Sequence, residues 1–140
     1  MYQYTEFDKQ FVQSRAAQHR DQLAHVVERS LNEIYLFDAK TLHFSYVNAG
    51  ARANLGYTLE QLAQMTPVDI KPEMDEVQFR AMIAPLLSGE LELLKFETVH
   101  QRADGSLAAM APAFARGLGR RALANALPAG AARNALDCAL

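Results

Sequence analysis

The sequence contains a single cysteine, Cys138, and no tryptophan. One cysteine excludes an intramolecular disulfide and any metal site that needs several cysteines. No apolar run approaches the roughly 20 residues of a membrane-spanning helix, and the first residues lack the basic-then-apolar order of a signal peptide. The formal net charge is only −2, whereas nucleic acid or an anionic membrane would require a strongly basic surface. These absences predict a cytoplasmic chain with no membrane span and no nucleic-acid partner.

Sequence motifs of catalysis are also missing. The four histidines lie in different segments without an H-E-x-x-H pattern, and the chain has neither a G-x-S-x-G motif nor a P-loop. Residues 117–122 match G-x-G-x-x-A, but no predicted βαβ unit surrounds them, so a dinucleotide site is not expected. The acidic residues Glu73, Asp75 and Glu76 fit the start of a helix, where the helix dipole favours negative charge. We therefore predict no metal site and no enzymatic activity.

The composition changes sharply near Ser106. Residues 107–140 contain no Val, Ile, Thr or Tyr, and about two-fifths of them are Ala. Before this point acidic residues outnumber Lys plus Arg by 15 to 10, whereas after it four arginines face only Asp137. A change in both propensity and charge is typical of a boundary. The sequence therefore predicts an N-terminal helical segment (1–30), a central domain (31–106) and an Ala/Arg-rich tail (107–140).

A helix is predicted from about Thr5 to Ser30, where strong helix formers occur without Gly or Pro. Residues that step by four and three form a heptad-like seam on this helix: Val12, Ala16, His19, Leu23 and Val26. Either the seam joins two copies of the chain, or the helix packs against its own domain. The first alternative predicts a homodimer.

The central segment alternates between strand and helix signals. Strands are predicted at 34–37 and 44–47, paired as a hairpin, followed by two short helices. Asn48 is expected to cap the first of these helices and a Thr58–Gln61 capping box to open the second. An apolar stripe indicates a helix over 73–88, and alternation indicates a strand over 91–102 with Phe96, Thr98 and His100 on its buried face.

Two motifs in this segment resemble those of PAS domains, the sensory-box family. Tyr46-Val47-Asn48-Ala49 followed by Leu55-Gly56-Tyr57-Thr58-Leu59-Glu60-Gln61-Leu62 resembles the family's "YVN-x-A…LGY-[ST]-x-E-[EQ]-L" signature. His100-Gln101-Arg102-Ala103-Asp104-Gly105-Ser106 resembles its "H-R-R-K-D-G-S" hairpin. The resemblance covers about residues 30–106. It implies an α+β fold, in which short helices cover one face of a five-stranded antiparallel sheet behind an amphipathic N-terminal helix.

The resemblance also implies a function. PAS domains are regulatory modules of bacterial two-component sensor histidine kinases, diguanylate cyclases and phosphodiesterases. We expect a sensory module that regulates an output domain of a larger signalling protein through ligand binding or dimerisation. The alternative is a PAS domain without ligand that acts only in protein interaction.

The resemblance to PAS domains also argues against several cofactors of that family. Members that bind flavin covalently need a cysteine where this chain has Pro67, and yellow-protein chromophores need a cysteine in the domain body. Members that bind haem commonly supply a histidine from the long helix, and residues 73–88 contain none. The cofactor therefore stays unknown: none is expected, with non-covalent flavin and haem held by another residue as alternatives.

A ligand pocket is expected between the sheet and the helices. The resemblance and the strand alternation place its lining at nine residues: Tyr35, Phe37, Met65, Ile70, Met82, Ile83, Phe96, Thr98 and His100. Alternatively, these side chains fill the interior at normal density without a cavity. His100 could hydrogen-bond a ligand or change its charge near neutral pH; alternatively, it is a partly solvated strand histidine near a turn.

The tail does not match the expected ending of the fold. A PAS domain needs two more strands after the Asp104-Gly105 turn, but residues 107–140 lack strand formers and contain Pro112 and Pro128. We therefore expect these strands to be missing or replaced, with at most 107–114 pairing briefly. The remainder would be Ala-rich helix or disorder, either a native low-complexity extension or a non-native segment read out of frame.

Overall fold

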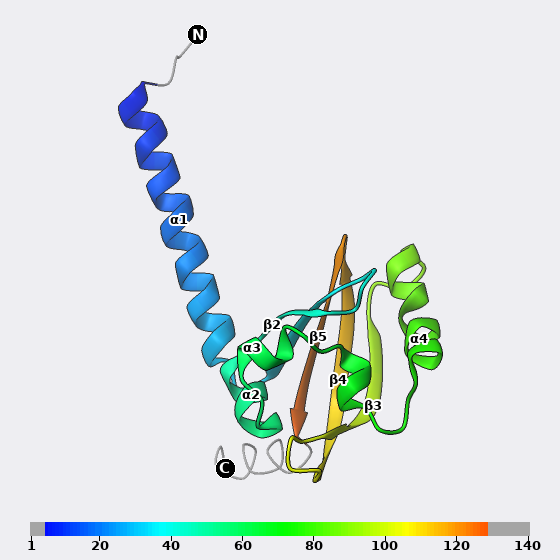
Figure 1. Cartoon of the computed structure of the whole chain (residues 1–140). Helices are drawn as coiled ribbons and strands as arrows, with labels where there is room; N and C mark the ends of the chain where they lie inside the picture. The colour runs from blue at the N-terminus through cyan, green and yellow to red at the C-terminus, as the bar shows by residue number, and fades with distance from the viewer. Residues whose placement is uncertain (1–4, 129–140) are drawn as a thin grey trace, which may run out of the picture.

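The predicted hairpin, the strand before the Asp104-Gly105 turn and two strands after it assemble into one antiparallel sheet of five strands, in the order β2-β1-β5-β4-β3 (Figure 1). The computed structural model describes residues 5–128. Its elements are α1 (Glu6–Arg29), β1 (Glu33–Asp38), β2 (Phe44–Val47), α2 (Ala49–Leu55), α3 (Leu59–Leu62), the 3₁₀ helix η1 (Pro67–Ile70), α4 (Glu76–Ser88), β3 (Leu94–Gln101), β4 (Leu107–Leu118) and β5 (Arg121–Pro128). The α+β class expected from the resemblance is confirmed.

Side-chain caps define where the short helices begin. The Asn48 side chain accepts a hydrogen bond from the Ala51 amide, and Thr58 and Gln61 form the expected capping box. The long helix α4 begins at Glu76 rather than at residue 73. Its start is displaced because the Asp75 side chain accepts from the Gln78 amide and thereby caps the helix.

The alternation that predicted the buried face of β3 is confirmed. Phe96, Thr98 and His100 lie on the inner face, whereas Lys95, just before Phe96, and Glu97, just after it, are exposed. The strand is shorter than the predicted 91–102, since it spans Leu94–Gln101.

The expectation that the C-terminal strands are missing is wrong. β4 pairs with β3 from Leu107 to Ala115, and β5 lies between β4 and β1. Alanine is a poor strand former, but both of these strands have hydrogen-bonded neighbours on each side, and tertiary pairing outweighs local propensity. Pro112 falls at the register irregularity between Met110 and Ala113, where a sheet tolerates proline. Residues 129–140, including Cys138, lie outside the described residues.

Helix α4 approaches the sheet closely at Gly117 of β4. A Cβ atom built on Gly117 would lie 2.9 Å from the Leu86 carbonyl oxygen. The glycine therefore permits the backbone contact between α4 and β4, and α4 and η1 cover the inner face of the sheet around the cavity described below.

Helix α1 projects away from the sheet (Figure 1). All five seam residues, Val12, Ala16, His19, Leu23 and Val26, are exposed. The alternative in which this seam packs against its own domain is therefore wrong. Among residues 5–128, no helix is long and apolar enough to cross a membrane.

Candidate functional site

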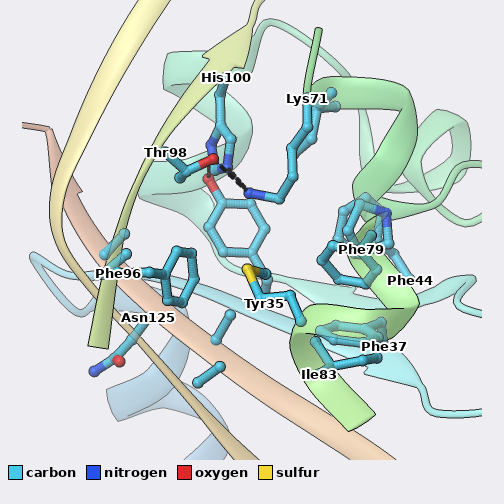
Figure 2. A pocket seen from close by; sticks show the side chains of 17 residues that line it. Tyr35, Phe37, Phe44, Lys71, Phe79, Ile83, Phe96, Thr98, His100 and Asn125 are labelled. Atoms are coloured by element: carbon cyan, nitrogen blue, oxygen red, sulfur yellow. Dashed lines mark hydrogen bonds between the residues drawn. The ribbon is translucent and has the colours of Figure 1, made fainter. Parts of the chain in front are cut away.

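A cavity of about 30 Å³ lies between the inner face of the sheet and the segment formed by η1 and α4 (Figure 2). Its wall is almost entirely apolar. The lining residues are Tyr35, Phe37, Phe44, Pro67, Ile70, Lys71, Phe79, Met82, Ile83, Phe96, Thr98, His100, Ala113, Ala115, Ala124, Asn125 and Ala126.

Alanines on β4 and β5 make room for this cavity. Ala113 and Ala115 on β4 face it beside Ala124 and Ala126 on β5. A side chain that ends at Cβ leaves unfilled the volume that a Val or Ile at the same strand position would occupy. The Ala-rich composition that argued against strands thus provides part of the wall of the cavity.

The structure places eight of the nine predicted pocket residues around this cavity. Met65 is the exception: it packs against the core cluster that includes Phe37 and Ile83, but it does not line the cavity. His100 is buried rather than partly solvated. Whether these residues bind a ligand stays a prediction.

Lys71 is a polar lining residue that the sequence reasoning missed. It follows η1 directly and is only 7 % exposed. Its Nζ donates to Thr98 Oγ1 at 2.9 Å, lies 3.1 Å from His100 Nε2 and sits 5.6 Å from the centre of the Phe96 ring. No local sequence signal marked it, since a lysine side chain is ordinarily exposed.

Burial determines the charges of this pair. It lowers the pKa of Lys71 to about 8, so the amine is mostly protonated at pH 7. Burial and the neighbouring Lys71 charge lower the pKa of His100 to about 3, so the imidazole is neutral. Nε2 of His100 therefore accepts from Lys71, which assigns the ring hydrogen to Nδ1.

The polar contacts continue from His100 to a buried carboxyl group. His100 Nδ1 lies 3.4 Å from the Tyr35 hydroxyl, which in turn donates to Glu33. Glu33 is 2 % exposed and also accepts from Asn54 Nδ2 at 2.9 Å. Burial raises the pKa of Glu33, and burial together with Glu33 raises the pKa of Tyr35. Glu33 was missed because a glutamate at a strand end is ordinarily exposed.

A second polar cluster fixes the end of α1 to the domain. Glu28 accepts two hydrogen bonds of 2.9 Å from the guanidinium of Arg52 on α2, and the Tyr46 hydroxyl donates to the same carboxylate. These contacts, chiefly the Arg52 hydrogen bond, lower the pKa of Glu28 to about 2. Asn48 completes the cluster, since its Nδ2 donates to the Val27 and Asn32 carbonyls at 2.9 Å each.

The residues present do not fit a large cofactor. Pockets for cofactor-sized ligands measure about 300–1,000 Å³, an order of magnitude more than this cavity of about 30 Å³. Pro67, the position compared with the flavin-attaching cysteine, lines the cavity and offers no thiol. No group of three or more potential metal ligands gathers in the part of the chain that the structure describes.

Comparison with solved structures identifies the fold. A PAS domain of an HTR-like protein from Haloarcula marismortui superposes with a TM-score of 0.72 at 22% identity, covering 85% of this chain and 98% of that one. A domain of a sensory box sensor histidine kinase/response regulator from Geobacter sulfurreducens gives 0.68 at 19% identity, covering 78% and 93%. The LOV protein of Rhodobacter sphaeroides gives 0.66 at 19% identity, covering 88% and 73%.

No protein-family model matches the sequence, and neither does any curated protein. The likeness is therefore carried by the structure, by the strand order and by the two sequence motifs. This chain has the PAS fold.

Proposed function

We propose that the protein is a PAS-type sensory module that regulates an output domain according to the occupancy of its cavity. The observation that carries this proposal is the cluster of Lys71, Thr98 and His100 in an otherwise apolar cavity. Small-molecule sites characteristically combine apolar walls with a few placed polar groups. The module has a regulatory rather than a catalytic role.

Helix α1 is the element that would carry the signal. From the cavity, Tyr35 bonds Glu33, and Glu33 bonds Asn54 on α2. Two residues earlier on α2, Arg52 pairs with Glu28 of α1. Helix α2 thus links a cavity residue to the projecting helix, and a ligand that favours one arrangement of this link shifts the position of α1.

We also propose an output domain for the larger protein to which the module would belong. The Geobacter sulfurreducens domain comes from a sensor histidine kinase/response regulator, which supports a kinase as output domain. A diguanylate cyclase is the other output class implied by the resemblance. A cytoplasmic location accompanies either choice.

A ligand-free dimerisation module is the second candidate. Two observations favour it: the cavity measures only about 30 Å³, and Val12, Leu23 and Val26 on α1 are 56%, 64% and 65% exposed. In this case the seam of α1 would join two copies while the interior of the domain stays closed.

Two-dimensional ¹H–¹⁵N NMR with a collection of small anionic, neutral and cationic compounds distinguishes the two candidates. The sensory proposal expects at least one compound to shift the amide signals of Thr98 and His100 together with those of Val27 and Glu28. In Asn54→Ala the cavity shifts persist and the α1 shifts shrink. If no compound perturbs the cavity amides while sedimentation shows a dimer, the ligand-free candidate replaces the sensory one.

A further inference from the structure

We propose that the cavity binds a short monocarboxylate of two or three carbons, whose carboxylate pairs with Lys71 and whose alkyl end contacts the alanines of β4 and β5. The inference deepens the proposed sensory function and rests on it. Three features of the cavity support it. Lys71 is a buried cation without a counter-ion, Lys71 and Thr98 have donors available to a ligand, and the cavity is small with mainly apolar walls.

Lys71 is the buried member of the lysines and arginines that the structure describes. Among the described residues Lys71 forms no ion pair, although it is 7 % exposed. Arg52, by contrast, is less buried and has a bidentate partner in Glu28. A buried charge without a counter-ion is costly, and the cost falls when an anion occupies the adjacent space. His100 and Thr98 face Lys71, and neither of them carries a negative charge.

The donors around Lys71 suit a carboxylate. An ammonium has three N–H donors, and two of those of Lys71 are directed to Thr98 Oγ1 and His100 Nε2. The third is available to a ligand. Since the Thr98 hydroxyl accepts from Lys71, its own hydrogen is free to donate. One carboxylate can thus accept from the ammonium with one oxygen and from the hydroxyl with the other.

The size of the cavity selects a short ligand. A water molecule needs at least about 10–15 Å³ of such a space, so 30 Å³ accommodates about two waters, or a carboxylate with one or two attached carbons. Beyond the polar cluster, the wall is mainly apolar and includes Phe96, Met82 and the alanines of β4 and β5. A second carboxylate would lack a cationic partner, and a cationic ligand would be repelled by Lys71.

Titration of the whole chain with acetate and propionate, followed by ¹H–¹⁵N NMR, tests the inference. Acetamide serves as the neutral isostere, ethylammonium as the cation, hexanoate as the long carboxylate and sodium chloride as the inorganic anion at equal ionic strength. We expect saturable shifts at Thr98 and His100 for acetate and propionate. Binding of the other four compounds should be weaker by at least about tenfold.

Three variants locate the site. Lys71→Met should remain folded, because it replaces a buried charge by an apolar side chain of similar length, and should weaken acetate binding at least about tenfold. Lys95→Met is the matched control, since Lys95 is exposed on β3. Ala115→Val suits a strand and should abolish binding by filling the cavity.

The outcomes separate the two proposals. If acetamide or hexanoate binds the cavity as well as acetate, or if a folded Lys71→Met binds acetate as wild type does, the carboxylate inference is overturned and the sensory function stands. If chloride binds the cavity with the same affinity as acetate, the inference is also overturned, because the cavity is then a general anion site. If acetate and propionate leave the cavity amides unshifted, the carboxylate inference fails. The sensory function fails only if no compound of the broader anionic, neutral and cationic collection shifts them.

Discussion

The ammonium of Lys71 lies 3.1 Å from Nε2 of His100, and both side chains are buried beneath the sheet. Two basic groups at this distance in a low-dielectric site do not both carry a charge. Lys71 keeps the proton, and His100 passes the polar contact on to Tyr35 and Glu33. The inner face of this PAS fold thus has a cation at one end of a buried polar chain and a carboxyl group at the other.

The neutral state of His100 predicts how stability depends on pH. The pKa of His100 is about 3 in the folded chain and about 6.5 when unfolded, so the unfolded state binds more protons between these values. His100 therefore lowers the free energy of unfolding as pH is lowered through this window, by about 3 kcal/mol between pH 7 and pH 4.

Urea denaturation of the wild type and of His100→Gln at both pH values measures this term. Glutamine retains hydrogen-bonding groups for Lys71 and Tyr35 but does not titrate. The variant should lose about 3 kcal/mol less than the wild type between pH 7 and pH 4. Parallel pH profiles of the two proteins would show that His100 is not buried in its neutral form.

Asn48 should contribute more to stability than an ordinary helix cap. Its side chain accepts from the Ile34 and Ala51 amides and donates to the Val27 and Asn32 carbonyls, and it is fully buried. We expect Asn48→Ala to lower the free energy of unfolding by about 3 kcal/mol, since several of these groups lose their partner. Asn32→Ala, at an exposed side chain, should change it by less than about 0.5 kcal/mol. Equal effects in urea melts would contradict this role.

The sequence predicted the helix caps but not the long-range polar contacts. The caps at Asn48 and Thr58 follow from local spacing, and the inner face of β3 follows from alternation along one strand. The contacts of Lys71 with His100 and of Glu28 with Arg52 join residues 29 and 24 positions apart. No local pattern specifies such pairs, and charged side chains are expected at the surface. Lys71 and Glu33 were missed for this reason.

The C-terminal strands were mispredicted for a related reason. Strand propensity is a property of each residue alone and takes no account of pairing. In the sheet, β5 pairs with β1 and β4, and β4 pairs with β5 and β3. On the inner face, small residues are what the cavity and the approach of α4 require. Ala113, Ala115 and Gly117 therefore fit a strand that their propensities argue against.

Gly117→Ala tests whether β4 belongs to the packed domain. The added Cβ would lie 2.9 Å from the Leu86 carbonyl oxygen, too close for the backbones to keep their positions. We expect a loss of about 1–3 kcal/mol in urea melts. Gly50→Ala is the matched control, since its Cβ would meet the Ser30 carbonyl oxygen at an ordinary 3.7 Å. If Gly117→Ala is as stable as Gly50→Ala, α4 does not pack on this strand.

The exposed seam of α1 predicts a homodimer. Burying Leu23, which is 64% exposed, would remove apolar surface from water. Light scattering should give twice the monomer mass for the wild type and the monomer mass for Leu23→Asp. Gln22→Asp adds the same charge to an exposed neighbour outside the seam and should remain dimeric. A monomeric wild type, or a Leu23→Asp variant as dimeric as the control, would contradict the seam.

The pKa of Lys71 tests most directly whether the cavity holds an unpaired cation that binds a carboxylate. The chain has four lysines, so ¹³C-labelled lysine gives few side-chain signals, and the Lys71→Met variant assigns the one of interest. NMR titration without ligand should give a pKa of about 8, and saturating acetate should raise it by at least about one unit, because the anion stabilises the protonated amine. A pKa near 10.4, unmoved by acetate, would show an exposed or already paired lysine and would contradict the account.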